Sequence, residues 1–362
     1  MAKNTSFFHK KLISWYLQNK RDLPWRGTAN PYFIWLSEIM LQQTRVAQGL
    51  PYYEKFVGTF PTVEDLANAP EERILKLWQG LGYYSRARNL HDTAKHVSSQ
   101  LGGNFPNNYI DLLELKGVGD YTASAIASIC FNEATAVVDG NVYRVLSRFF
   151  GIDTPINGTP GIKEFKSLAQ RLMDPTQPGT YNQAIMEFGA RHCVPQNPNC
   201  AECIFNDKCI ALAQDKVGVL PMKLKKTKIR KRYFNYIVAH SEDQKTILQQ
   251  RTEKGIWQQL YEFPLIETDT EIGATELKKL QKYKELSKAL KIESLSLYNE
   301  TSVTHKLSHQ HLYTRFWIAA ISEAPNHKDS AKEKGVPIAK VKDYAVPVLI
   351  ENFISDFSVF KI

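Results

Sequence analysis

Residues 113–148 read LELKGVGDYTASAIASICFNEATAVVDGNVYRVLSR, and this stretch decides the fold. It opens on a turn, which includes Lys116, Gly117 and Gly119, between two helical patterns. Two glycines so close together let the backbone turn sharply and approach another molecule without an intervening Cβ. A helix is predicted to start near Tyr121, because apolar residues follow at helical spacing. The unpaired amides at its start predict an anion site that suits a nucleic-acid phosphate.

The composition is that of a globular chain with an excess of positive charge. A length of 362 residues is enough for two domains that each bury a core, and the 43% apolar and 23% charged residues are ordinary proportions. The formal net charge of +9 favours a polyanionic partner without identifying one. No run of about eighteen apolar residues occurs, so we expect no membrane-spanning helix.

Two carboxylates stand out in the first half of the chain. Glu38 lies among apolar residues in a helical pattern over residues 32–49, where lost solvation predicts a raised pKa and a general acid near neutral pH. A half-exposed helical glutamate is the commoner explanation of such a position. Asp139 immediately precedes a second helical pattern, where a helix cap is the common role of an aspartate. The helix start also favours its ionised form.

Four of the five cysteines fall in one short segment with the spacing C-x6-C-x2-C-x5-C. They are Cys193, Cys200, Cys203 and Cys209. This clustering indicates a metal centre rather than disulfides, and therefore a reducing, cytoplasmic location. Thiolates suit both zinc and iron–sulfur clusters, and the spacing alone leaves both open.

The periodicity changes in the last third of the chain. Residues 216–232 contain many lysines and arginines and no acids, which predicts a basic interdomain linker. Residues 233–362 combine β-like segments rich in Tyr, Phe, Ile and Val with two helical patterns, which indicates a small α/β domain. We therefore predict domains at 1–215 and 233–362.

The glycine turn followed by VDGNVYRVLSR resembles the endonuclease III superfamily of helix-hairpin-helix DNA glycosylases. The segment SEIMLQQTRV resembles its adenine-excising branch, the A/G-specific adenine glycosylases of the MutY type. The resemblance implies a mainly α first region of the helix-hairpin-helix glycosylase fold. In it, Glu38 would protonate adenine N7, Asp139 would stabilise the positive sugar, and Asn141 would orient Asp139 or a water. Tyr121 stands where lyase members have a lysine, so only glycosidic cleavage is expected.

The resemblance also implies that several residues contact DNA. For each of them the alternative is an ordinary structural position in a solvated loop, on the surface or in the core. Arg21, Trp25 and Arg26 would lie beside the extruded base, and Gln183 would recognise adenine. The turn residues Lys116, Gly117 and Gly119 would contact the backbone. The side chains expected to insert into the duplex are Gln43, Leu81 and Tyr83.

The cysteine spacing matches the cluster loop of the superfamily, residues 193–209, which implies a [4Fe-4S] cluster. The segment GIWQQLYEFP resembles the Nudix-like C-terminal domain of adenine glycosylases. That domain would recognise 8-oxoguanine through Leu307, Ser308 and His309, where the family usually has Phe in place of Leu307. The run of glutamates that a Nudix hydrolase carries is missing from the sequence, so the domain is expected to bind rather than hydrolyse.

These features predict a monofunctional enzyme of base excision repair. It would act as a monomer on double-stranded DNA, remove adenine opposite 8-oxoguanine or guanine, and have no membrane association. A thymine or uracil mismatch glycosylase of the same superfamily is one alternative. The second domain argues against it, because members of that branch are usually shorter. A non-catalytic iron–sulfur DNA-binding module is the other.

Overall fold

The computed structural model describes residues 2–224, 229–324 and 333–361. The chain forms two compact units. Unit 1 comprises Met1–Asn68 and Asn89–Lys225, and unit 2 comprises Ala69–Arg88 and Lys226–Ile362. Unit 2 therefore includes a segment that the predicted boundaries place in the first domain.

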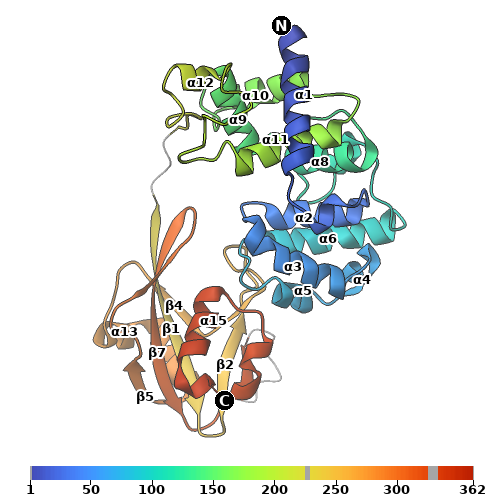
Figure 1. Ribbon diagram of the computed structural model, residues 1–362. Helices are drawn as coiled ribbons and strands as arrows, with labels where there is room; N and C mark the ends of the chain where they lie inside the picture. The colour runs from blue at the N-terminus through green and yellow to red at the C-terminus, as the bar shows by residue number, and fades with distance from the viewer. Residues whose placement is uncertain (1, 225–228, 325–332, 362) are drawn as a thin grey trace. The chain divides into compact units, whose positions relative to one another are not determined.

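The regular elements described up to residue 224 are all helical, as the sequence predicts (Figure 1). They are α1 (Ala2–Asn19), η1 (Pro24–Arg26), α2 (Pro31–Leu41), α3 (Val46–Thr59), α4 (Val63–Asn68), α5 (Glu71–Leu77), α6 (Ser85–Gln100), α7 (Tyr109–Leu113), α8 (Asp120–Phe131), α9 (Gly140–Phe150), α10 (Thr159–Leu172), α11 (Pro178–Arg191) and α12 (Ile210–Ala213).

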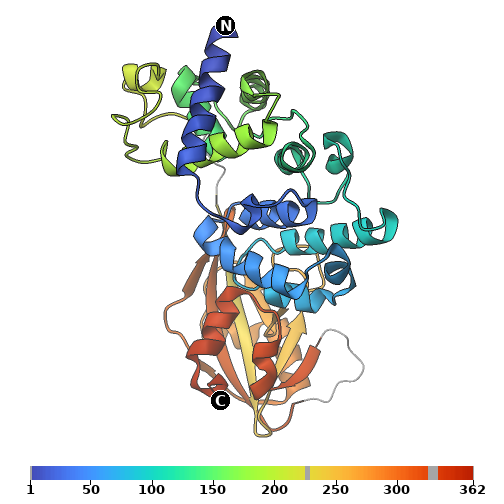
Figure 2. The same cartoon turned by 45° about the vertical axis from the view of Figure 1, so that its right-hand side comes forward.

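An aromatic core packs α1, α11 and the cysteine-rich loop of unit 1 together. Phe8 on α1 stacks on Phe205 of the cysteine-rich loop with 5.0 Å between ring centroids, and Phe188 on α11 packs against the same ring at 5.4 Å. The helix α11 lies alongside both α1 and α9 (Figures 1 and 2). Chain segments nearly 200 residues apart in sequence thereby share one core.

The predicted hairpin joins α7 to α8. Gly117 has a φ of +80°, and a Cβ added there would lie 2.8 Å from the Cβ of Asn89. Gly119 has an extended backbone with φ −96°, and a Cβ there would meet nothing within 4 Å. The turn itself therefore requires glycine only at the first position, whereas the second leaves the start of α8 open to another molecule.

The described residues of unit 2 form two sheets, and their strands are numbered in chain order. They are β1 (Arg230–Ser241), β2 (Lys245–Gln250), β3 (Tyr261–Glu262), β4 (Leu265–Thr268), β5 (Ile292–Leu297), β6 (Val303–Lys306), β7 (Gln310–Ile321) and β8 (Glu333–Pro337). One sheet has the order β4-β1-β7-β5 with β6 also paired to β7, and the other has the order β3-β2-β8. Strands β1 and β7 run parallel. Residues 225–228 of the predicted linker lie outside the described residues.

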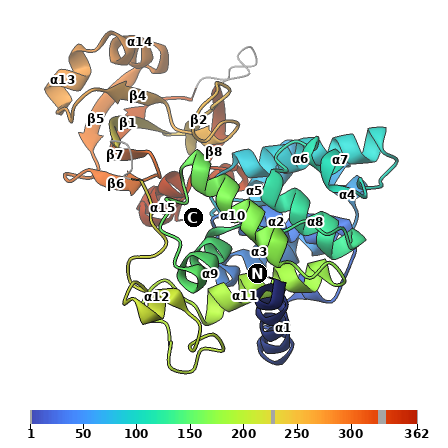
Figure 3. The ribbon, with the colours of Figure 1, turned by 90° about the horizontal axis from the view of Figure 1, so that it is seen from above.

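Helices cover both faces of the larger sheet, as two neighbouring residues of β7 show. Successive side chains on a strand point to opposite faces of the sheet. Phe316 on β7 stacks on Phe353 of α15 (Val348–Asp356), with 4.0 Å between ring centroids. Trp317 points the other way and packs with residues of α13 (Ala274–Lys279) and α14 (Gln281–Leu290). Figure 3 shows α13 and α14 side by side next to β4 and β5. This arrangement confirms the predicted α/β class. The remaining described elements are the 3-10 helices η2 (Ile338–Asp343) and η3 (Ser358–Phe360).

Candidate active site

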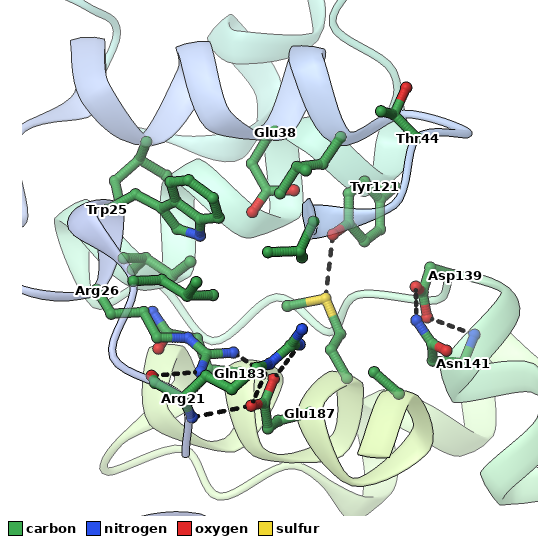
Figure 4. Close-up of a pocket in the computed structure, with 17 residues that line it drawn as sticks. Arg21, Trp25, Arg26, Glu38, Thr44, Tyr121, Asp139, Asn141, Gln183 and Glu187 are labelled. Atoms are coloured by element: carbon green, nitrogen blue, oxygen red, sulfur yellow. Dashed lines mark hydrogen bonds and ion pairs between the residues drawn. The ribbon is translucent and has the colours of Figure 1, made fainter. Parts of the chain in front are cut away.

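Side chains from distant parts of unit 1 line one pocket of about 170 Å³ (Figure 4). It lies between α2, η1, α8, the start of α9 and α11. Eight of the residues singled out in the sequence line it: Arg21, Trp25, Arg26, Glu38, Tyr121, Asp139, Asn141 and Gln183. The pocket therefore gathers both candidate catalytic carboxylates and the polar residues expected around a base.

Glu38 is a buried carboxylate on α2. Its side chain lies at 9% exposure on a helix whose other residues from Ile34 to Met40 are also buried. Burial raises its pKa from 4.5 to about 7, while the Tyr121 hydroxyl and Arg26 oppose that rise and Asp139 adds to it. A carboxyl with a pKa near 7 keeps a large protonated fraction at neutral pH and can donate that proton.

Asp139 caps the N-terminus of α9. One of its carboxylate oxygens accepts from the amides of Asn141 at 2.9 Å and Val142 at 2.8 Å. The other accepts from the side-chain amide of Asn141 at 2.7 Å. Burial raises the pKa of Asp139, while these hydrogen bonds and Arg144 act to lower it. The hydrogen bonds at the helix start therefore favour the ionised form of Asp139, whereas its burial, which was not evident from the sequence, favours the protonated form.

Arg144 extends this cap into a network that the sequence analysis missed. Its guanidinium donates to the Asn141 side-chain oxygen at 2.9 Å and to the backbone oxygens of Gly189 at 2.6 Å and Cys193 at 2.7 Å. Since Asn141 then points its amide group toward Asp139, its orientation is determined from both sides. The i, i+3 spacing of Asn141 and Arg144 was the only available signal.

The second residue that the sequence analysis missed is Glu187, on the floor of the pocket. Arg21 donates to its two carboxylate oxygens at 2.8 and 2.6 Å, and Arg26 donates to one of them at 2.5 Å. Burial alone would raise the pKa of Glu187, but the hydrogen bonds from both arginines outweigh it and lower the pKa to about 2. This ion cluster orients the two arginines that the family resemblance predicts to lie beside the base. The signal for Glu187 was its spacing of four residues from Gln183 on one helix.

Gln183 and Tyr121 face the pocket with their polar groups already engaged. The Gln183 side-chain oxygen accepts from the hydroxyl of Tyr16. The Tyr121 hydroxyl donates to the sulfur of Met186 at 3.0 Å (Figure 4). Trp25 is buried at the pocket wall and packs edge-on against Tyr53.

The residues expected to insert into DNA lie outside this pocket. Gln43, just past the end of α2, and Tyr83 both have left-handed backbones, with φ of +54° and +48°, and both are exposed. Such conformations are uncommon for these residue types and are often found at functional sites. Leu81 is instead only 4% exposed. In this conformation Leu81 belongs to the core, the alternative noted from the sequence. The turn residue Lys116 forms an ion pair with Asp92.

Unit 2 brings two separately predicted DNA-contacting positions together. The Tyr83 and Ser308 hydroxyls are hydrogen-bonded at 2.6 Å, although 225 residues separate them in sequence. Ser308 lies in the turn between β6 and β7, closed by the Leu307 amide donating to the Gln310 carbonyl at 2.8 Å. His309 is exposed, and its carbonyl accepts from the Arg230 amide.

The four clustered cysteines line one small cavity in unit 1, together with Arg148. The Arg148 guanidinium donates to the sulfur of Cys193 at 3.5 Å, and the Phe205 amide donates to the sulfur of Cys203 at 3.4 Å. Among the described residues, no group of three or more His, Cys, Asp or Glu is arranged to hold a metal ion. Nevertheless, four thiols line one cavity and N–H donors are directed at two of the sulfurs, a donor set that suits either zinc or an iron–sulfur cluster.

Across the described ranges, no helix has the length and apolar character needed to span a bilayer.

Two family models match the chain. Residues 36–171 match the HhH-GPD superfamily base excision DNA repair protein model, and residues 235–356 match the NUDIX domain model. The two matches confirm the fold expected for each part of the chain.

Curated relatives and a solved structure extend these matches. The chain is 48% identical over 213 residues to human adenine DNA glycosylase, covering 56% of this chain but only 39% of the human protein. It is 36% identical over 322 residues to adenine DNA glycosylase of Buchnera aphidicola subsp. Baizongia pistaciae, covering 87% of this chain and 86% of that protein. The structure of a thermostable thymine-DNA glycosylase is 30% identical, with a TM-score of 0.55, and covers 59% of this chain and 98% of that one. The two-domain match to the bacterial relative shows that the chain belongs to the adenine DNA glycosylase family.

Proposed function

We propose that this chain hydrolyses the N-glycosidic bond of adenine mispaired with 8-oxoguanine or guanine in DNA. The observation that carries the proposal is the presence of Glu38 and Asp139 in one pocket, with burial raising the pKa of Glu38 to about 7. Two carboxyl groups in different surroundings can serve as proton donor and anion in a single reaction.

The proposed chemistry divides the work between these two groups. Glu38 donates its proton to N7 of the extruded adenine, so that the base leaves as a neutral species. The sugar then has oxocarbenium character, and the Asp139 carboxylate, held by Asn141, stabilises that charge until water adds. Tyr121 is close to both groups but cannot form a Schiff base. The product is therefore an abasic site without strand cleavage.

Other residues that line the same pocket would recognise the base. The Gln183 amide is of the type that pairs with adenine's hydrogen-bonding edge. Arg26 lies beside it and is anchored by Glu187. Trp25 contributes an aromatic surface. Extrusion costs a few kcal/mol of unstacking, which Gln43 and Tyr83 would partly replace by insertion.

We further propose that the turn around Ser308 recognises the oxidised guanine. Its exposed hydroxyl can donate or accept, as the altered N7 and O8 edge of 8-oxoguanine requires. Leu307 and His309 flank it. The neighbouring Tyr83 hydroxyl supports assigning both residues to one lesion-contacting surface.

The cysteine cavity is proposed to hold a [4Fe-4S] cluster. Cys193, Cys200, Cys203 and Cys209 would be its ligands, and Arg148 would offset part of their negative charge. When bound, the cluster supplies structural organisation of residues 193–209. Phe205 lies within these residues and packs in the helical core, so the cysteine-rich loop is attached to the rest of unit 1.

A glycosylase assay tests the function directly. Labelled duplexes with adenine opposite 8-oxoguanine or guanine, and with thymine opposite guanine, are incubated with the cluster-loaded chain, and abasic sites are then cleaved with alkali. We expect adenine release, and its loss in Glu38→Gln and Asp139→Asn with duplex binding retained. Glu164→Gln, an exposed carboxylate on α10, is the matched control.

A thymine-specific activity is the second candidate, because the similar thymine-DNA glycosylase structure is 98% covered by this chain. Cleavage of the T:G duplex alone would favour it. Binding without cleavage of any of the three duplexes would favour a non-catalytic DNA-binding module.

A further inference from the structure

Tyr16 is buried on α1 and is linked to the active-site pocket through Gln183 on α11. Its hydroxyl donates to the Gln183 side-chain oxygen, across 167 residues of sequence. Gln183 lines the pocket that contains Glu38 and Asp139 (Figure 4), whereas Tyr16 lines the adjoining cavity of about 320 Å³. Because the amide oxygen is bound to Tyr16, the NH2 group of Gln183 is the end left for the pocket.

The surroundings of Tyr16 favour this arrangement of the amide. The guanidinium of Arg26 lies 5.5 Å from the centre of the Tyr16 ring, and Arg26 is itself paired with Glu187 on α11. Burial raises the pKa of the Tyr16 phenol, so the hydroxyl keeps its proton and can donate it. Reversal of the Gln183 amide would require the phenol oxygen to accept instead and its proton to find another acceptor. The observed orientation is therefore favoured by about the strength of one hydrogen bond.

The orientation of an amide decides which base it can pair with. An extruded base is recognised through its Watson–Crick edge. On adenine that edge presents the N1 acceptor beside the N6 donor, whereas on hypoxanthine it presents a protonated N1 beside the O6 acceptor. The Gln183 amide, as Tyr16 holds it, can donate to adenine N1 while the second lone pair of its oxygen accepts from N6. Hypoxanthine needs the reverse order of donor and acceptor, and thus the reversed amide.

We propose that Tyr16 is a positioning residue that makes the pocket selective for adenine over 6-oxopurines, because it holds the Gln183 amide in one orientation. This inference rests on the proposed function, since that function places the base against Gln183. Tyr16 itself would touch neither the base nor the sugar, and its effect passes through the amide. A residue with only a structural role would instead change the rates for both bases by the same factor.

The first test compares single-turnover release of adenine and of hypoxanthine, each opposite 8-oxoguanine, by the parent and by Tyr16→Phe. Without the hydroxyl the Gln183 amide can reverse freely, so the adenine-to-hypoxanthine rate ratio should fall about fivefold, the factor that corresponds to one neutral hydrogen bond. Any intrinsic difference between the two leaving groups cancels between parent and variant. Tyr32→Phe is the matched control and should leave the ratio unchanged, because Tyr32 is also buried in unit 1 but donates to the Phe60 carbonyl at 2.7 Å.

A double variant shows whether the effect passes through the amide. Gln183→Ala should lower the ratio at least as far as Tyr16→Phe does, and adding Tyr16→Phe to it should cause no further fall. The proposal is overturned if Tyr16→Phe slows the release of both bases equally, or if it lowers the ratio equally far in the Gln183→Ala background. Circular dichroism and melting temperature verify that each variant is folded.

A binding measurement without turnover separates this proposal from the function itself. Duplexes that carry 2′-fluoro-2′-deoxyadenosine or its inosine analogue resist cleavage, because the fluorine destabilises a positive sugar. The ratio of their dissociation constants should also change by about fivefold in Tyr16→Phe. If the parent releases no adenine, the proposed function fails, while this affinity ratio still decides the role of Tyr16. An affinity ratio that is the same in parent and variant rejects that role whether or not the chain is active.

Discussion

Replacing Glu187 by glutamine would measure how much its ion pairs with Arg21 and Arg26 contribute to the free energy of unfolding. Glu187 is 1% exposed and receives hydrogen bonds from Arg21 and Arg26, which are 34% and 11% exposed. Glutamine preserves the shape but removes the negative charge. Two guanidinium groups then remain next to each other with no carboxylate between them.

The size of the effect follows from the carboxyl group's own ionisation. Although burial opposes it, the arginine hydrogen bonds lower the pKa of Glu187 from 4.5 to about 2, which corresponds to about 3 kcal/mol of stabilisation. Because Arg21 is one-third exposed, solvent screening reduces this figure, and we expect Glu187→Gln to lower the free energy of unfolding by about 2 kcal/mol at pH 7.

The sign of the pH dependence provides an independent check. A pKa that is lower in the folded state contributes stability above about pH 4.5, and that stability is lost as the pH falls toward 2. Between pH 5 and pH 3.5 the parent should therefore lose about 1 kcal/mol more than Glu187→Gln does. Urea unfolding followed by helical circular dichroism measures both values.

Glu164→Gln, on the exposed face of α10, is the matched control and should follow the parent at every pH. If Glu187→Gln instead has the same stability as the parent at pH 7, or the same loss between pH 5 and pH 3.5, the argument from the arginine pair is wrong.

Two further predictions concern the DNA-contacting turns. Gly117→Ala should destabilise unit 1 by about 1–3 kcal/mol, because its φ is +80° and the new Cβ meets Asn89 at 2.8 Å, whereas Gly119→Ala should leave thermal stability unchanged and weaken duplex binding. Equal melting temperatures for the two variants would contradict this difference. Tyr83→Phe and Ser308→Ala should each reduce the preference for adenine opposite 8-oxoguanine over adenine opposite guanine, because each removes one partner of the 2.6 Å hydrogen bond. A double variant whose loss equals the product of the single losses would show that the hydroxyls act independently.

The local elements of this chain were predictable from short-range patterns. The helical periodicity before and after the glycine turn corresponds to α7 and α8, and Asp139 stands at the N-cap that its position indicates. The enrichment in Tyr, Phe, Ile, Val and Thr after residue 230 corresponds to β1 and β7. Such signals survive in a sequence because the contacts that produce them lie within a few residues of one another.

Long-range contacts decided the properties of the pocket. That Glu38 is buried and not half-exposed depends on α8 packing against α2. The pairing of Arg21 with Glu187 spans 166 residues, and nothing near Glu187 in the sequence indicates its partners.

The sequence alone determined which chemical groups this protein has available: a carboxylate in an apolar helix, another at a helix start, a tyrosine in the place of a lysine, and four clustered thiols. Only the tertiary structure decided their protonation and orientation, as with the Tyr121 hydroxyl directed to Met186. Solvation and hydrogen bonding depend on every neighbour in space, and most of those neighbours are distant in the chain.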